Sequence, residues 1–255
     1  MPLRSSRCKL RVTESNKPRL YLIKDYSMIK GLALIAKKAT VTEAFFHQHW
    51  RETHGPLALR IKALRRYVQS HRIAPALPGF ESVPYDGVAE IWFDTLDIIV
   101  NFPNNPDYIN GALADEPNFI DQSKLAFLAT REHVLIEGPP IAKDTKLVKA
   151  IFLLHRLKGM SVADFQAYWL NEHGPQIPRD AGIVRYVQCH QLPETYATGT
   201  PAYDGMAELF FEDLAAFQAY WGSSRIQAIF AADAPRFLDA ATTAFLAEET
   251  RVLWP

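Results

Sequence analysis

A short apolar run at residues 28–36 (MIKGLALIA) predicts a buried β-strand early in the chain. Phe46, Trp50 and His54 then recur at helical spacing, so they lie on one stripe of a predicted helix. We expect Gly55-Pro56 to end this helix, because glycine supplies a left-handed cap and proline cannot continue a helix. The pattern therefore predicts a strand and then a helix whose inner stripe ends in histidine.

Two more strands are predicted at residues 65–72 and 85–94, with Pro- and Gly-containing loop sequence between them. A less regular helical segment follows at about 108–128, and a last strand lies near 131–136. The order β-α-β-β-α-β is that of a ferredoxin-like unit.

The same pattern then occurs a second time. The segment FHQHWRETHGP at 46–56 returns as FQAYWLNEHGP at 165–175, which is 119 positions later, and the offset becomes 118 from Tyr85 onwards. Thr42 and Ser161 stand at equivalent places before the two helices, and we expect both to act as N-caps. Two copies of so long a unit indicate two similar lobes rather than a solenoid.

The repeat divides the chain into a basic N-terminal arm at 1–27, a first lobe at 28–139, a linker at 140–146 and a second lobe at 147–255. A lone sheet of this kind leaves one face apolar, so pairing two sheets face to face would bury both. We therefore expect an α+β fold in which two tandem ferredoxin-like lobes pack sheet to sheet as one intramolecular barrel.

Amino-acid composition and charge limit the kinds of binding partner to expect. Of the 255 residues 48% are hydrophobic, which fits a globular protein, and the formal net charge is zero. Nothing in this balance favours nucleic acid or an anionic membrane as partner. Residues 1–27 hold seven Lys/Arg and two Asp/Glu, which we interpret as a solvated basic tail.

The chain shows neither a secretory signal pattern nor an apolar stretch near the ~18 residues of a membrane span. A cytoplasmic location is then the default expectation. The two cysteines, Cys8 in the arm and Cys189 in a predicted strand, are not expected to form a structural disulfide.

Two histidines at the helix ends are the first candidates for chemistry. His54 and His173 could act as acid/base groups facing a cavity between helix and sheet. The alternative is structural, because a protonated histidine in a last helical turn gains ~0.3–1 kcal/mol from the helix dipole. Both interpretations can hold at once.

Tyr67, Gln69 and His71 alternate along one predicted strand, so all three point to the same face. Burying the glutamine and the histidine unpaired would cost about 1–3 kcal/mol each, which favours a polar pocket unless the face is a solvent-exposed edge. The second copy repeats the set as Tyr186, Gln188 and His190.

The neighbouring strand carries carboxylates and aromatic rings on a shared face. They are Asp86, Glu90 and Trp92 in the first copy, and Asp204, Glu208 and Phe210 in the second. A carboxylate beside a histidine or tyrosine can orient that partner or act as a base. The alternatives are turn residues for the aspartates and ion pairing for the glutamates. Aromatic candidates for lining a pocket also include Trp50, Trp169, Tyr85 and Tyr203, although most could be ordinary core.

No metal or cofactor site is expected. His47 and His49 are two positions apart on a helix, so their side chains diverge by about 200° and suit chelation poorly. The sequence has no C-x-x-C pair, no G-x-G-x-x-G loop and no Walker A loop.

Three motifs then occur together as they do in a known family. They are F-x-x-[HY]-W-x-x-x-H-G-P, R-Y-V-x-x-H and Y-D-G-x-A-E, at 46–56, 66–71 and 85–90, and again at 165–175, 185–190 and 203–208. Through them the chain after residue 27 resembles the EthD family of the dimeric α+β barrel superfamily. The resemblance implies a barrel made here by one chain, and the sequence leaves open whether two such chains form a homodimer.

The resemblance also implies a class of function. Members and close relatives act on small hydrophobic molecules, often aromatic or polyketide-like, commonly with no bound cofactor. They include oxygenases, cyclases and decarboxylases. Other branches of the superfamily bind haem through a histidine, an alternative that the sequence leaves open.

We therefore expect a cofactor-independent enzyme that acts by acid/base catalysis on a small phenolic substrate. The simplest reaction is that of a lyase, which breaks a C–C or C–O bond and can release a small aldehyde. A cofactorless oxygenase, a polyketide-type cyclase and a non-catalytic protein that binds a hydrophobic ligand are the alternatives. RNA binding is disfavoured, because no strand shows the K/R-G-F/Y-G/A-F pattern.

The two copies are unequal in ways that bear on function. His49 aligns with Tyr168, and His133 is expected to align with Arg251. Freed from strict symmetry, one lobe could hold the working pocket while the other completes the barrel.

Overall fold

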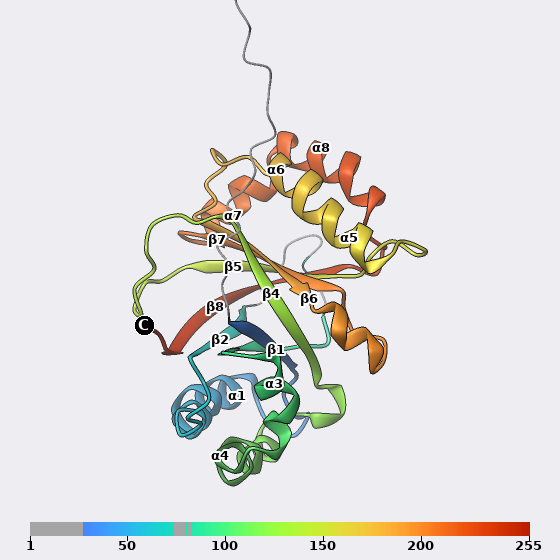
Figure 1. Cartoon of the computed structure of the whole chain (residues 1–255). Coiled ribbons are helices and arrows are strands. Elements are labelled where there is room, and N and C mark those ends of the chain that lie inside the picture. The colour runs from blue at the N-terminus through green and yellow to red at the C-terminus, as the bar shows by residue number, and fades with distance from the viewer. Residues whose placement is uncertain (1–27, 74–79, 81–82) are drawn as a thin grey trace, which may run out of the picture.

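Eight strands close into one barrel, and the helices of the two repeats cover it from opposite sides (Figure 1). The computed structural model describes residues 28–73, 80 and 83–255. The predicted intramolecular α+β barrel is confirmed. The basic arm expected at 1–27 lies outside the described residues.

The first repeat alternates strands with short helical segments. Its elements are β1 (Ile29–Ile35), α1 (Glu43–His49), the π-helical turn η1 (Trp50–His54), α2 (Gly55–Ala58), β2 (Arg66–Ile73), β3 (Gly87–Phe93), α3 (Leu96–Asn101), η2 (Phe102–Asn104), α4 (Pro106–Tyr108), the π-helical turn η3 (Ile109–Leu113), η4 (Glu116–Asn118), η5 (Gln122–Lys124) and β4 (Ala126–Ile136). The less regular helical segment predicted at about 108–128 is present, but it starts earlier, with α3 at Leu96, and it ends before β4 starts at Ala126.

The second repeat follows the same order with longer helices near its end. Its elements are β5 (Val148–Leu154), α5 (Val162–Tyr168), the π-helical turn η6 (Trp169–His173), α6 (Gly174–Gln176), β6 (Arg185–Gln191), η7 (Pro193–Ala197), β7 (Gly205–Phe211), α7 (Leu214–Trp221), α8 (Ser224–Asp233), η8 (Ala234–Arg236) and β8 (Thr243–Leu253).

The strand order around the barrel is β1-β3-β2-β8-β5-β7-β6-β4, and β4 pairs with β1 to close it. The two repeats meet at antiparallel pairs between their edge strands, β2 with β8 and β4 with β6. The lobes therefore join through backbone hydrogen bonds at two seams, in addition to the face-to-face packing that we expected. Closing the barrel removes the exposed strand edges that a lone sheet would leave.

The register of the last strand corrects one alignment. Lys30 lies opposite Thr130 on β4, and its counterpart Lys149 lies opposite Ala247 on β8. The offset between repeats is therefore 117 in these strands, and Arg251 corresponds to Val134 rather than to His133 as we expected.

The helix starts follow the prediction. Thr42 Oγ1 accepts a hydrogen bond from the backbone N–H of Phe45 at 3.1 Å, and Ser161 Oγ accepts one from Asp164 at 3.0 Å. These are the side-chain caps that satisfy a free donor in the first turn.

The predicted helix end at Gly55 was wrong. Gly55 is right-handed, with φ −53°, and the chain passes through the π-helical turn into α2. A Cβ at Gly55 would lie 3.2 Å from Gln69 Nε2, so the glycine serves the close approach of helix and strand. Single π-helical turns within α-helices, such as η1, are frequent at functional sites.

Candidate functional site

Each repeat encloses a cavity between its helices and the outer face of its strands. The first cavity is about 380 Å³ and mostly apolar, and its titratable lining residues are His54, Tyr67, Tyr108 and Glu116. The second is about 400 Å³, and its titratable lining residues are His173, Tyr186 and Asp239. Cavities of this size suit small organic ligands.

The strand residues predicted to form a polar pocket are brought together as a hydrogen-bonded chain. Gln69 Nε2 donates to the phenol oxygen of Tyr67 at 3.1 Å and to the carbonyl of Trp50 at 2.7 Å. Gln69 Oε1 lies 3.1 Å from His71 Nε2, which must therefore carry the proton. His71 thus fixes the orientation of the amide and does not itself line the cavity.

Tyr67 is held so that its own proton remains available. Its oxygen accepts from Gln69 Nε2 and, at 3.0 Å, from Trp50 Nε1. Burial raises the pKa of Tyr67 to about 12, against the lowering effect of these two donors, so the phenol is neutral at neutral pH. Because both bonds are accepted, the hydroxyl proton is the part of the group that can be donated into the cavity.

His54 forms a dyad with an aspartate that we did not predict. His54 Nδ1 lies 3.1 Å from Asp115 Oδ2, and Asp115 also accepts from His49 Nε2 at 2.9 Å and Asn118 Nδ2 at 3.0 Å. Burial alone would raise the pKa of Asp115, but the bonds from His54 and Asn118 outweigh it and hold the pKa well below its usual range. The carboxylate is an acceptor only, so Nδ1 carries the proton and Nε2 of a neutral His54 has a lone pair.

The second repeat contains the same arrangement. Gln188 Nε2 donates to Tyr186 Oη and to the carbonyl of Trp169, both at 2.9 Å. His173 Nδ1 lies 2.7 Å from Asp233 Oδ2, and His190 Nε2 lies 2.9 Å from Gln188 Oε1. Burial outweighs the aspartate and lowers the pKa of His173, and burial also lowers the pKa of His190.

The repeats differ in the groups around this shared arrangement. Tyr108 donates to Glu116 Oε1 at 2.5 Å in the first cavity, whereas the corresponding residues of the second repeat are Ile226 and Ala234. Tyr168 takes the place of His49 and donates to Asp233 at 2.6 Å. The first cavity is therefore distinguished by its tyrosine–glutamate pair, whereas Asp239, Thr242 and Thr243 line the second.

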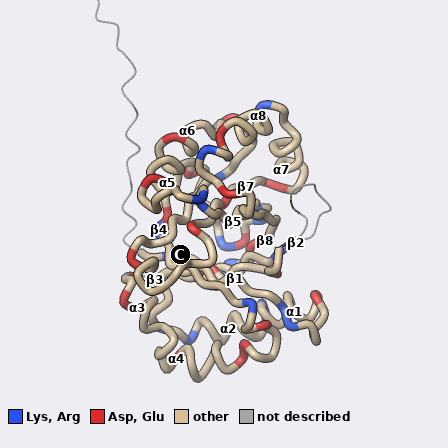
Figure 2. The backbone as a smooth tube through the Cα atoms, turned by 90° about the vertical axis from the view of Figure 1, so that its right-hand side faces the viewer, with Lys and Arg blue, Asp and Glu red and all other residues tan. Residues whose placement is uncertain are grey.

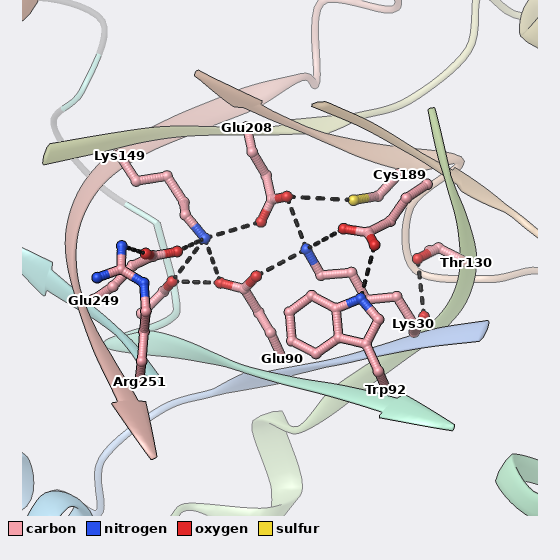
Figure 3. Close-up of polar contacts among 11 residues, drawn as sticks. Lys30, Glu90, Trp92, Thr130, Lys149, Cys189, Glu208, Glu249 and Arg251 are labelled. Atoms are coloured by element: carbon pink, nitrogen blue, oxygen red, sulfur yellow. Dashed lines mark hydrogen bonds and ion pairs between the residues drawn. The ribbon is translucent and has the colours of Figure 1, made fainter. Parts of the chain in front are cut away.

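The carboxylates and aromatic rings of β3 and β7 lie on the opposite face of the sheet. Glu90, Trp92, Glu208 and Phe210 point into the barrel, where Figure 3 shows the polar ones together. Among the described residues no histidine or tyrosine contacts Glu90 or Glu208. Of the two interpretations left open for the glutamates, ion pairing holds and a place beside the strand triad does not, because Glu90 and Tyr67 lie on opposite faces of one sheet.

The barrel interior instead holds a buried ion cluster that both repeats build (Figure 3). Lys30 Nζ lies 2.8 Å from both Glu90 and Glu208 and 3.2 Å from Glu132. Lys149 Nζ lies 2.6 Å from Glu90 and 3.0 Å from Glu208. Each lysine thus contacts the glutamate of its own repeat and that of the other, so the cluster ties the lobes together.

The cluster continues through Glu249, which lies 2.5 Å from Lys149 and pairs with Arg251. Three cations face four carboxylates, so one shared proton makes the cluster neutral. Burial and the charge of Glu90 raise the pKa of Glu208 to about 7. Charges also mark the strands between the helix layers in Figure 2, where a purely apolar barrel would show none.

The remaining predicted residues lie away from the cavities. Asp86 accepts from the backbone N–H of Lys37 at 2.8 Å and pairs with Arg72, and Asp204 pairs with Arg156 in the same way. Tyr85 and Tyr203 are buried in the barrel core, with ring centroids 6.3 Å apart. Of the predicted aromatic lining residues, Trp50 and Trp169 do line the two cavities.

One group of side chains has the spacing of metal ligands. Ligand atoms of Glu132, Cys189 and Glu208 lie within 4.8 Å of one another. The ammonium of Lys30 contacts both glutamates, so a cation already stands where a metal ion would.

One family model matches the chain twice, once in each repeat. The family model described as the EthD domain matches residues 38–123 and again residues 157–241. The chain belongs to the EthD family. No sequence among curated proteins matches it.

Solved structures share the fold of this EthD protein at low sequence identity. An anthrone oxidase-like protein superimposes with a TM-score of 0.65 at 8% identity, covering 89% of this chain and 94% of that one. A proposed monooxygenase from Fusobacterium nucleatum gives 0.55 at 7%, covering 88% and 92%. A proposed chlorite dismutase gives 0.53 at 9%, covering 89% and 96%. At such low sequence identity, these superpositions show a shared fold and no more.

Sequence reasoning missed the aspartates of the EthD dyads, although a signal was present. Asp115 and Asp233 occupy equivalent positions two residues before matching prolines, within the stretch that aligns at an offset of 118. Glu116 and Tyr108 gave no such signal, because the second repeat has other residues at the equivalent positions.

No helix among the described residues is long and apolar enough to cross a membrane.

Proposed function

We propose that the protein is an enzyme that removes a proton from a small hydroxylated aromatic compound in the first cavity. The observation that carries the proposal is the His54–Asp115 dyad beside a phenol whose proton is free. His54 Nε2 is the general base, and Asp115 is a positioning residue that keeps the proton on Nδ1. Tyr67 donates a hydrogen bond to the oxyanion that develops.

The reaction that needs only these groups is a retro-aldol cleavage. The ring first passes to its keto form, because His54 takes the proton of the ring hydroxyl and returns it to the ring carbon that carries the hydroxyalkyl side chain. His54 then takes the proton of the side-chain hydroxyl, and the C–C bond to that ring carbon breaks as the C–O double bond of an aldehyde forms. The bonding electrons restore the aromatic ring and place the charge on the ring oxygen, an oxyanion that Tyr67 stabilises and that protonated His54 then neutralises.

The first cavity is proposed over the second because its dyad lies beside further polar groups. Glu116 and Tyr108 line it, while the corresponding positions in the second repeat are apolar. The second lobe then serves mainly to complete the barrel, as the inequality of the two copies suggested. Two ferredoxin-like lobes, one working and one supporting, are the interpretation we favour for the tandem chain.

A cofactorless oxidation is the second candidate. The observation that favours it is the fold shared with an anthrone oxidase-like protein and a proposed monooxygenase. It would begin with the same proton abstraction, after which the electron-rich ring anion would react with O₂ instead of expelling a fragment.

The test is turnover of metal-stripped protein on phenols that carry a hydroxyalkyl side chain and on polyketide-like aromatic ketones, with mass spectrometry and an oxygen electrode read together. Aldehyde release without O₂ uptake, lost in His54→Gln and kept in the matched His173→Gln, is the expected result. O₂ consumption that depends on His54 would move the reaction to oxidation. Turnover of no compound, or turnover unaffected by His54→Gln, would contradict the proposal.

A further inference from the structure

Glu116 places a carboxylate in the wall of an otherwise apolar cavity. It is buried, with 8% of its surface exposed. Among the described residues its hydrogen-bond partners are the phenol of Tyr108 at 2.5 Å and the amide of Gln122 at 3.2 Å. Neither partner is a cation, so the environment that would normally compensate a buried carboxylate is incomplete.

The two partners leave acceptor capacity on Glu116. Each partner binds a different carboxylate oxygen, whereas an ionised carboxylate offers about four acceptor sites. Burial and the neighbouring carboxylate raise the pKa of Tyr108, so this phenol stays a donor and holds Glu116 in place. A donor group on a ligand in the cavity would complete the set.

Glu116 also lies within electrostatic reach of the proposed reaction centre. Its negative charge adds to burial in raising the pKa of Tyr67. Both residues line the same cavity as His54. A ligand bound to Glu116 is therefore in the same space as the base.

We propose that Glu116 binds a hydroxyl group of the ligand and makes the first cavity selective for hydroxylated aromatic compounds. The assignment rests on the proposed function, because it names the substrate class for the same pocket. The hydroxyl that Glu116 binds is one that stays intact, distinct from the hydroxyls that His54 deprotonates. Tyr108 acts as a positioning residue for the carboxylate.

The second repeat supplies an internal control. Ala234 stands where the first repeat has Glu116, and Ile226 stands where it has Tyr108. The carboxylate that lines the second cavity, Asp239, already accepts from the backbone N–H of Ala241 at 2.9 Å. The second cavity should therefore discriminate weakly between a hydroxylated ligand and its apolar isostere.

The experiment measures binding without turnover. Equilibrium dialysis of the full chain with 2-naphthol and with 2-methylnaphthalene compares a hydroxyl with a methyl group of similar size. We expect the tightest site to prefer 2-naphthol by about 10-fold to 100-fold, the range for a hydrogen bond to a charged group. Glu116→Leu should abolish this preference, and the matched Ala234→Leu in the second cavity should leave it unchanged.

Two further variants keep the result interpretable if Glu116→Leu folds poorly. Glu116→Gln preserves size and one acceptor oxygen and should reduce the preference to a few-fold. Tyr108→Phe frees an acceptor site on Glu116 and should preserve the preference for 2-naphthol. Thermal unfolding of each variant shows whether the fold is retained.

Each contrary outcome has a distinct meaning. An unchanged preference in folded Glu116→Leu and Glu116→Gln would overturn the assignment. Tighter binding of protonated 2-(aminomethyl)naphthalene than of 2-naphthol would also overturn it, since the site would then be one for a cation. If Glu116 controls binding but no hydroxylated aromatic is turned over, the proposed function fails while this recognition site stands.

Discussion

The two cavities are built on the same side-chain positions and differ in a few groups around them. A tryptophan, a histidine, a tyrosine, a glutamine and an aspartate recur in both, and so does the π-helical turn that carries the histidine. The first cavity alone adds Tyr108 and Glu116, where the second repeat has Ile226 and Ala234.

This difference separates buried polar groups that the fold requires from buried polar groups that serve function. The recurring network pairs the buried tryptophan, glutamine and aspartate groups that the helix and strand bring together, which a packed structure requires in both lobes. The groups that do not recur have no such structural duty, since the second lobe folds without them. We therefore assign function to the unequal groups and to the shared dyad that lies beside them.

Substitutions in the barrel interior should destabilise the protein equally whichever lobe they fall in, and they should have the largest effect on stability. Lys30→Met and Lys149→Met should each lower the free energy of unfolding by about 3–5 kcal/mol, because each removes one of the two ammonium groups that buried Glu90 and Glu208 share. Urea denaturation measures both, with the exposed Lys62→Met as control at about 0.5 kcal/mol or less. A large loss in only one of the two lysine variants would break the equivalence.

The cavities, in contrast, should respond unequally. Tyr67→Phe should lower kcat about 100-fold, because it removes the donor to the developing oxyanion. Tyr186→Phe, the matched change in the second lobe, should leave kcat within about two-fold. Steady-state rates on the substrate found in the turnover screen decide this, and equal losses in the two variants would mean that both cavities react.

The shared proton of the ion cluster predicts a pH dependence of stability. The pKa of Glu208 is raised from 4.5 to about 7, so its contribution to stability is complete below pH 4.5 and is lost as the pH rises through 7. Glu208→Gln removes this titration and should flatten the fall in Tm between pH 5 and pH 8 by a few degrees. Calorimetry with the exposed Glu212→Gln as control measures the difference, and parallel curves for wild type and Glu208→Gln would refute it.

Differences between the lobes at the surface should matter least. Arg65 pairs with Asp94 at 2.5 Å with both side chains about half exposed, and the second repeat has Val184 in place of the arginine. Arg65→Ala should change the free energy of unfolding by no more than about 1 kcal/mol and leave activity unchanged. A larger change in urea denaturation would show that unequal positions outside the cavities also carry weight.

Much of the fold could be predicted from the sequence because the repeat and the strand periodicity are local signals. The grouping of Tyr67, Gln69 and His71 on one face also followed from the two-residue period of a strand. Which face meets the helices does not follow from that period. Glu90 was therefore placed beside the wrong neighbours, although it lies on a strand that we had located.

The rest of the site depends on contacts between distant segments. Asp115 reaches His54 across 61 positions, and Lys30 reaches Glu208 across 178. Lys30 sits inside an apolar run that we interpreted as plain core. The π-helical turn was also missed, because Gly55-Pro56 is typical of a helix end, whereas the close approach of Gln69, a distant residue, explains the glycine.

The central claim is that the first cavity reacts and the second supports. The most direct measurement is the kcat of Asp115→Asn beside that of Asp233→Asn, with thermal unfolding to confirm that both fold. An asparagine can donate to His54 Nδ1 and so exchange the tautomer that the base requires. We predict a loss of about 100-fold to 10,000-fold for Asp115→Asn and a change within about three-fold for Asp233→Asn. The reverse order, or an equal loss in both variants, would contradict the assignment of the reaction to the first cavity.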